Sequence, residues 1–172
     1  MALSMYQTSI PVFVRGLDAL ALLLAKALEH AEEAGMVPEV LLGARLAPDM
    51  LPLSAQVQRA SDTSTLSVQR LSGVAAPRFD DSEASFEQLQ ERIANTITYL
   101  NSVSAAQLEA SEERTVALDL GSFPPSFKGD DYLLMFALPN FFFHIATAHG
   151  ILRNNGVPVG KLDYLGPYGA QQ

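Results

Sequence analysis

The chain has no cysteine and no tryptophan, and its 11 Lys and Arg residues are outnumbered by 19 Asp and Glu residues, giving a formal net charge of −8. Without cysteine there are no disulfides, no thiolate metal sites and no cysteine nucleophiles. An acidic surface does not favour phosphate neutralisation. We therefore expect no nucleic-acid binding.

The sequence also lacks a basic N-terminal region and a long uncharged apolar run. Residues 1–4 contain no Lys or Arg, and the apolar run at 20–24 is bracketed by Asp18 and Lys26. Such a run is too short to span a membrane or to act as a signal peptide. We predict a cytoplasmic protein with no membrane contact.

What is present suffices for a packed core. A chain of 172 residues with 48% hydrophobic content fits one domain, which we place at residues 1–172.

Four segments show the three-and-four spacing of apolar residues that is typical of amphipathic helices. The first covers about residues 9–34, with Pro11 in its first turn and Gly35 as its stop. The second is capped by Asp49 and ends near Leu71. Its inward row is predicted to be Leu53, Val57, Ala60, Ser64 and Leu71, with Gln56, Arg59 and Asp62 close to that row.

The third helix is predicted to be capped within residues 80–83 and to end near residue 102, and the fourth to run from Asp130 or Asp131 to Asn154. Between them, residues 105–112 suggest one short helix. The alternation at 115–120 and the return at 123–127 predict two strands around a turn at 121–122. The pattern favours an all-α four-helix bundle with a small β-hairpin before the last helix, followed by a Gly- and Pro-rich tail.

The last helix is the most apolar segment and carries the candidate site. His144 is in phase with its apolar face and lies one turn after Asn140. Pro139 is expected to kink the axis and free the carbonyl of Met135. A buried amide or imidazole without a partner costs about 1–3 kcal/mol. We therefore predict that the two side chains share a partner or a ligand.

His144 has two interpretations that the sequence leaves open: a structural histidine held by a hydrogen bond, or a ligand-binding group. Gln56 and Asp49 are further candidate ligand-binding residues, although Asp49 is also explained as a simple cap. His149 lies about 140° around the helix from His144, so the pair is poorly placed to chelate one metal. His30 lies among acidic residues and is interpreted as part of a solvated helix end.

Several catalytic motifs are absent. The sequence has no Gly-x-Ser-x-Gly elbow and no His-Glu-x-x-His, and residues 156–161 lack the spacing and the hydroxyl of a phosphate-binding loop. Three successive aromatic residues, at 141–143, point in different directions around a helix, so at least one is expected to leave the core. A homodimer follows as a hypothesis.

Five short sequences occur together in this chain: Gly16-Leu17-Asp18, Arg45-Leu46-Ala47-Pro48-Asp49-Met50, Pro139-Asn140-Phe141-Phe142-Phe143-His144, Ile151-Leu152-Arg153 and Gly160-Lys161-x-Asp163-Tyr164-Leu165-Gly166. The combination resembles a bacterial domain-of-unknown-function family of the DinB-like superfamily, over nearly the whole chain. The resemblance implies an up-down-down-up four-helix bundle, often dimeric, without an established activity.

The resemblance also implies a metal site. DinB-like enzymes, some of them thiol-dependent transferases, typically hold a divalent metal with one histidine of the second helix and a His-x-x-x-His pair of the fourth. Here the second helix has no histidine, and Ala148 stands where the pair's second member would be. The triad is therefore broken, and His144 is left as a weak candidate metal ligand. A remnant metal site of Asp49, Asn140 and His144 would require these three side chains to converge.

Three hypotheses follow. The first is a bundle whose polar cleft around His144 binds a small molecule or a partner. The second is a metal-dependent hydrolase or thiol transferase with His144 as one ligand, and the third is a structural dimer without a ligand site. Whether the protein is an enzyme, and with which cofactor, stays open at this point.

Overall fold

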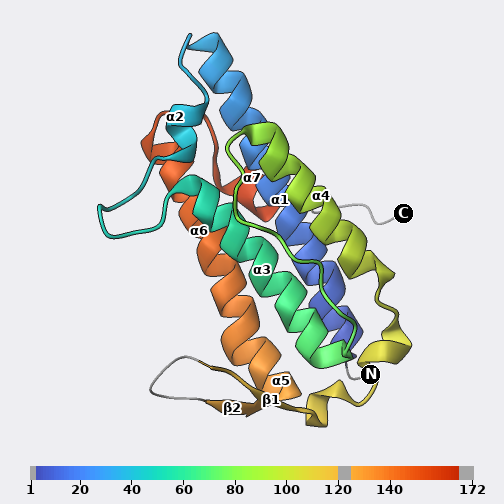
Figure 1. The fold of residues 1–172 in the computed structure, drawn as a ribbon. Helices are drawn as coiled ribbons and strands as arrows, with labels where there is room; N and C mark the ends of the chain where they lie inside the picture. The colour runs from blue at the N-terminus through green and yellow to red at the C-terminus, as the bar shows by residue number, and fades with distance from the viewer. Residues whose placement is uncertain (1–2, 120–124, 167–172) are drawn as a thin grey trace.

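Four long helices lie side by side in the computed structural model, which describes residues 3–119 and 125–166 (Figure 1). They are α1 (Met5–Glu33), α3 (Leu53–Ser72), α4 (Phe86–Ser102) and a last helix of three segments, α5 (Gly129–Asp131), η3 (Tyr132–Ala137) and α6 (Leu138–Asn154). The helices α1 and α6 run in one direction, and α3 and α4 run in the other (Figure 1). The connection at residues 73–85 returns along the length of the bundle from the end of α3 to the start of α4 (Figure 1). This confirms the predicted up-down-down-up bundle.

Helix α1 begins and ends with clear signals. Ser4 forms a capping box with Gln7, and Gly35 takes a positive φ of 64° just beyond the C-cap residue Ala34, a conformation that glycine adopts without strain. The start lies four residues earlier than the predicted Ser9. The prediction for Pro11 was therefore wrong, because this proline lies inside the helix rather than in its first turn.

The predicted acidic caps of the other helices were wrong. Asp49 lies on an exposed loop, and Pro52 takes the N-cap position of α3 without a side-chain hydrogen bond. The cap of α4 is Ser85, whose hydroxyl accepts from the backbone N–H of Gln88 at 3.3 Å. A cap must have extended backbone directly before the first turn, and the acidic residues at 80–83 lie too far upstream.

The last helix likewise begins before its predicted cap. Its N-cap is Lys128, so Asp130 and Asp131 lie in the first turn, where negative charge is favoured by the helix dipole. A π-helix, η3, ends at Ala137, two residues before Pro139, and the kink predicted at Pro139 stays a prediction. The α-helix then continues through Pro139, the second residue of α6.

The core lies between the four helices. The predicted inward row of α3, from Leu53 to Leu71, is buried. The rings of Phe13 and Phe141 meet edge to face with centroids 4.9 Å apart, and a Cβ on Gly16 would overlap the ring of Phe141. Glycine at this position therefore allows α1 and α6 to approach closely.

The smaller elements lie at the two ends of the bundle and along α1 (Figure 1). One end holds the 3₁₀ turns η1 (Ala105–Leu108) and η2 (Ser111–Glu113), in place of the single predicted helix, and the antiparallel strands β1 (Thr115–Ala117) and β2 (Ser126–Lys128). The hairpin is confirmed, whereas its predicted turn at 121–122 lies outside the described residues. Phe127 of β2 packs against Tyr132 and Phe136 of η3, with ring centroids 6.2 and 6.1 Å away.

The other end holds α2 (Glu39–Leu42), whereas α7 (Lys161–Leu165) packs along the middle of α1, where Arg15 donates to the carbonyl of Leu165 at 2.7 Å. Part of the predicted tail therefore belongs to the packed structure: Val157 and Val159 are buried, and Asp163 pairs with Lys26 of α1 at 2.6 Å.

Two helices, Met5–Glu33 and Gly129–Asn154, are long and apolar enough to cross a membrane by length and composition alone. The uncharged run at 20–24 did not predict this property, because it is only a small part of the first helix. Half of the qualifying window of the first helix (50%) and 39% of that of the second are buried inside the bundle, and buried core helices pass the same test. The absence of membrane contact stays a prediction.

Candidate ligand-binding cleft

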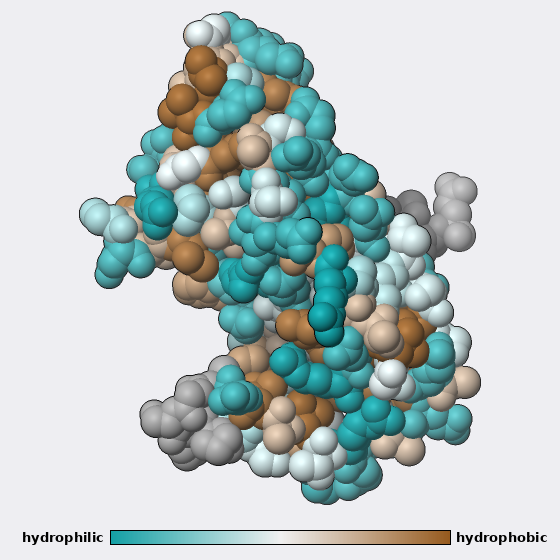
Figure 2. Space-filling view, viewed as in Figure 1, coloured by the Kyte–Doolittle hydropathy of each residue, from teal (hydrophilic) through white to brown (hydrophobic). Residues whose placement is uncertain are grey.

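A cleft of about 440 Å³ lies between α3, the last helix and the hairpin. Figure 2 shows the surface hollowed on the side where the hairpin end meets the rest of the bundle. The last helix lines it with Tyr132, Phe136, Asn140 and His144, and β1 is continued by Leu118 and Asp119 at its edge. Helix α3 supplies the opposite wall: Arg59, Asp62, Thr63, Leu66, Ser67 and Arg70.

The π-helix explains why four residues spaced at intervals of four face one cleft. Four residues of a regular α-helix turn through about 400°, so His144 would be rotated about 120° away from Tyr132. A π-helix takes one more residue per turn. With the π-helix at Tyr132–Ala137, the rotation falls to about 20°, and Tyr132 stays in line with Asn140 and His144.

His144 is held by a hydrogen bond that fixes its tautomer. Its Nδ1 lies 2.7 Å from Oε1 of Gln56, and Nε2 of Gln56 donates to the carbonyl of Leu51 at 3.0 Å. Because a carbonyl only accepts, the amide orientation of Gln56 is determined and Nδ1 of His144 must donate. The lone pair is therefore on Nε2 of His144.

Electrostatics keep this imidazole neutral. Burial, and secondly the positive charge of Arg59, lower the pKa of His144 from its ordinary value. A neutral imidazole with Nδ1 protonated offers Nε2 as a hydrogen-bond acceptor or a base.

Asn140 is held from across the cleft. Its Nδ2 donates to Oγ1 of Thr63 at 3.0 Å, which leaves the amide oxygen Oδ1 as an acceptor. Two neighbouring acceptors, on His144 and Asn140, suit a ligand that carries hydroxyl or amine donors.

A charged network continues from the cleft into the bundle. Arg59 pairs with Asp62 at 3.1 Å and with Asp81. Asp62 and Asp81 also bind the buried Arg92, at 2.6 and 2.7 Å, together with Glu83 at 2.8 Å. This network ties the chain between α3 and α4 to both helices, and burial raises the pKa of Asp62 despite the two arginines.

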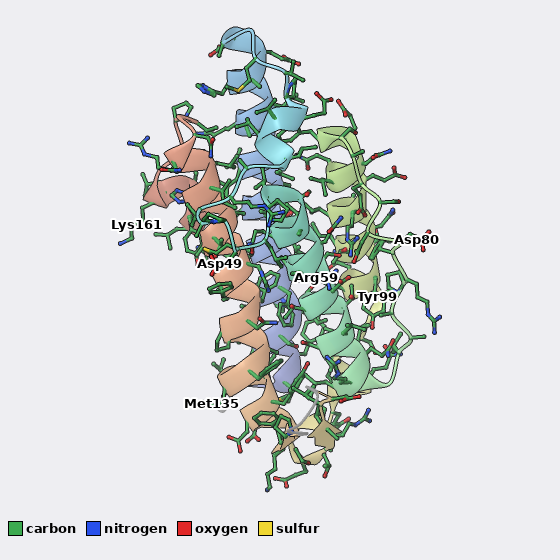
Figure 3. The ribbon with its side chains drawn as sticks, turned by 60° about the vertical axis from the view of Figure 1, so that its left-hand side comes forward. Asp49, Arg59, Asp80, Tyr99, Met135 and Lys161 are labelled. Atoms are coloured by element: carbon green, nitrogen blue, oxygen red, sulfur yellow. The ribbon has the colours of Figure 1, made fainter. Side chains whose placement is uncertain are left out.

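The structure brings together three of the four residues selected from the sequence. His144 and Asn140 line one cleft, and Gln56 holds His144. Asp49 is not among the residues that line the cleft; Figure 3 shows it on the loop before α3, whereas Arg59 lies on α3 itself. The predicted pairing of Arg59 with Asp62 is present.

Sequence reasoning missed Ser67, Arg70, Tyr132 and Phe136. The four-residue spacing of Tyr132, Phe136 and Asn140 was the available signal. In a regular α-helix these positions are spread around the axis. The four-residue spacing indicates a shared face only when the π-helix is known.

The described residues do not fit the metal site of the superfamily. No group of three His, Cys, Asp or Glu residues able to hold a metal occurs in the part of the chain that the structure describes. Helix α3 faces His144 with Gln56, whose amide is engaged at both ends. His149 lies elsewhere, with Nε2 3.1 Å from the carbonyl of Gly160 and its ring against Tyr164.

With this geometry established, the comparisons with known proteins place the chain. The model of a family described as "Domain of unknown function (DUF1993)" matches residues 5–165. The chain belongs to this family. The DUF1993 chain is also similar to the crystal structure of a DinB family member protein from Shewanella denitrificans, with 39% identity and a TM-score of 0.90, over 96% of this chain and 95% of that one.

No curated protein matches the DUF1993 chain. The similarities establish its family and its DinB-like fold, and they assign it no activity.

Proposed function

We propose that the cleft binds a small polar molecule through His144 and Asn140. The observation that carries this proposal is that both side chains line one cavity while their inward donors are already satisfied by Gln56 and Thr63. Each then presents an acceptor, Nε2 and Oδ1, to the cavity. The ligand is expected to carry hydroxyl or amine groups that donate to both.

The test follows the histidine side chains, because the chain has 3 histidines and their signals can be told apart. The side-chain resonances of His30, His144 and His149 are followed by NMR while hydroxylated and amine-bearing metabolites are added one at a time. A ligand of the cleft shifts the resonances of His144 and leaves those of the other two in place. Its affinity should fall at least tenfold in Asn140→Leu, because one acceptor is lost.

A variant that fills the cleft supplies the control. Leu66 lines the cleft and is 39% exposed, so Leu66→Trp adds volume without removing a buried group. It should abolish the shift of His144, while Leu162→Trp on α7 should not. Compounds that leave His144 unmoved, or that bind Leu66→Trp as well as the unmodified protein, would argue against the proposal.

We also propose that the protein forms a homodimer through the outer side of the last helix. Leu134, Met135 and Phe143 are 54%, 73% and 55% exposed on this helix, and Pro139 between them is exposed too. Figure 3 shows Met135 pointing away from the bundle. An apolar face of this kind is stabilised when a second chain covers it.

The assembly is tested by sedimentation velocity at micromolar concentration. The unmodified protein should sediment as a dimer and Met135→Glu as a monomer, whereas Leu162→Glu, at a position 67% exposed on α7, should remain dimeric. A monomeric mass for the unmodified protein would refute the dimer and leave the cleft proposal untouched.

A further inference from the structure

Arg70 differs from the other arginines near the cleft in its charge balance. Arg59 and Arg92 are each paired with two or more carboxylates. Within residues 3–119 and 125–166, none of the ion pairs closer than 4 Å includes Arg70. Arg70 therefore brings to the cleft a positive charge that is not held in a close ion pair with any of these residues.

The guanidinium of Arg70 is held in place by the hydroxyl of a buried tyrosine. Its Nη1 donates to the hydroxyl of Tyr132 at 2.9 Å, and that hydroxyl also lies 3.0 Å from Oγ of Ser67. Tyr132 and Ser67 are 1% and 0% exposed, and the guanidinium carbon lies 5.9 Å from the centre of the Tyr132 ring. Most donors of the guanidinium thus have no partner among the described residues, while its position is fixed from behind.

Holding an arginine in this way has a desolvation cost. Arg70 is half-buried, and removing a charge from water without an opposite charge is unfavourable. Its place in the last turn of α3 offsets part of the cost through the helix dipole. Tyr132, however, draws the side chain onto the cleft wall, where an oxyanion would supply the missing charge and accept two parallel hydrogen bonds.

We propose that Arg70, positioned by Tyr132 and Ser67, is an anion-binding subsite that holds the carboxylate or phosphate group of the molecule bound in the cleft. This deepens the proposed function and, for the identity of the ligand, rests on it. Thr63, the partner of Asn140, precedes Arg70 by seven residues on α3, which is about 10 Å along the axis. The ligand class is therefore an elongated hydroxy or amino acid, or a phosphate ester, whose anion lies on the order of 10 Å from its donor groups.

The subsite is tested on the full chain with inorganic phosphate and with acetate, each added at constant ionic strength and followed by NMR at the Arg70 and Tyr132 side chains. Saturable shifts are expected for at least one anion, and the one that binds tighter identifies the headgroup. Binding should weaken at least tenfold in Arg70→Gln and less in Arg70→Lys, which keeps the charge but loses the planar fork.

Two control variants separate the subsite from general charge effects. Arg153→Gln removes an exposed arginine near the end of α6, and Arg78→Gln removes an exposed arginine between α3 and α4; both should bind the anion as the unmodified protein does. Shifts that do not saturate, or that are equal in Arg70→Gln, would overturn the subsite. Arg70→Lys keeps the test decisive if Arg70→Gln folds poorly.

The two proposals fail in different ways. If metabolites bind at His144 with the same affinity in Arg70→Gln and neither anion binds, the subsite is wrong and the cleft proposal stands. If an anion binds through Arg70 but no metabolite shifts His144, the cleft proposal is wrong and the subsite stands.

Discussion

Nδ1 of His144 donates to Oε1 of Gln56 over 2.7 Å, and the other end of that amide donates to the backbone of Leu51. Gln56 thereby connects the last helix to the loop before α3 and determines which nitrogen of His144 carries the proton. The imidazole is at once a structural hydrogen-bond donor and, through Nε2, an acceptor. The two interpretations that the sequence left open for His144 are compatible.

The tautomer can be measured directly. In ¹⁵N spectra at neutral pH, Nδ1 of His144 should carry the proton and Nε2 should not. Gln56→Glu places a carboxylate beside Nδ1, so the pKa of His144 should rise above that of the unmodified protein. Gln56→Leu should cost about 1–3 kcal/mol of stability, since it leaves Nδ1 and the Leu51 carbonyl without this partner. A protonated Nε2 in the unmodified protein would contradict the assignment.

The pH dependence of folding has a definite sign at His144. Its folded-state pKa is lowered from 6.5, so below that pH the unfolded chain takes up the proton more readily than the folded protein. The free energy of unfolding should fall as the pH drops below 6.5, and His144→Gln should flatten this fall. Chemical denaturation at a series of pH values measures it. Arg59→Gln, which removes one cause of the lowered pKa, should bring the NMR titration midpoint of His144 closer to 6.5, and an unchanged midpoint would count against that cause.

The buried arginine of the charged network is expected to be a major determinant of stability. Arg92→Met leaves Asp62, Asp81 and Glu83 close together without their shared cation, and breaking buried pairs of this kind costs about 3–5 kcal/mol. Hydrogen exchange should accelerate in residues 73–85, because the network holds this connection. Arg78→Met, at an exposed position in the same connection, should have a small effect; equal effects of the two substitutions would refute the role of the network.

Metal content distinguishes this protein from metal-binding DinB-like enzymes. Protein purified without an affinity tag should contain less than stoichiometric Zn, Ni or Mn, because Gln56 faces His144 and Ala148 lies fully buried at the next turn. The measurement is elemental analysis by mass spectrometry, with His144→Ala as the comparison. Stoichiometric metal that is lost in His144→Ala would revive the metalloenzyme hypothesis.

The sequence predicted the bundle because apolar periodicity is a local property. The inward row of α3 is buried as expected, and period-two alternation located the first strand. Helix starts were less predictable. Asp49 and the acidic residues at 80–83 have the chemistry of caps, but only the path of the chain decides whether a residue precedes the first turn with an extended backbone.

The sequence by itself determined that His144 and Asn140 share one helix face and that the second helix has no histidine to complete a metal triad. Only the tertiary structure decided what surrounds them. The π-helix brought Tyr132 into the same line, and the packing of α3 against the last helix placed Gln56 at His144 and Arg70 at Tyr132. Such contacts join residues more than sixty positions apart, and their existence depends on how two helices rotate and slide against each other, which no local pattern specifies.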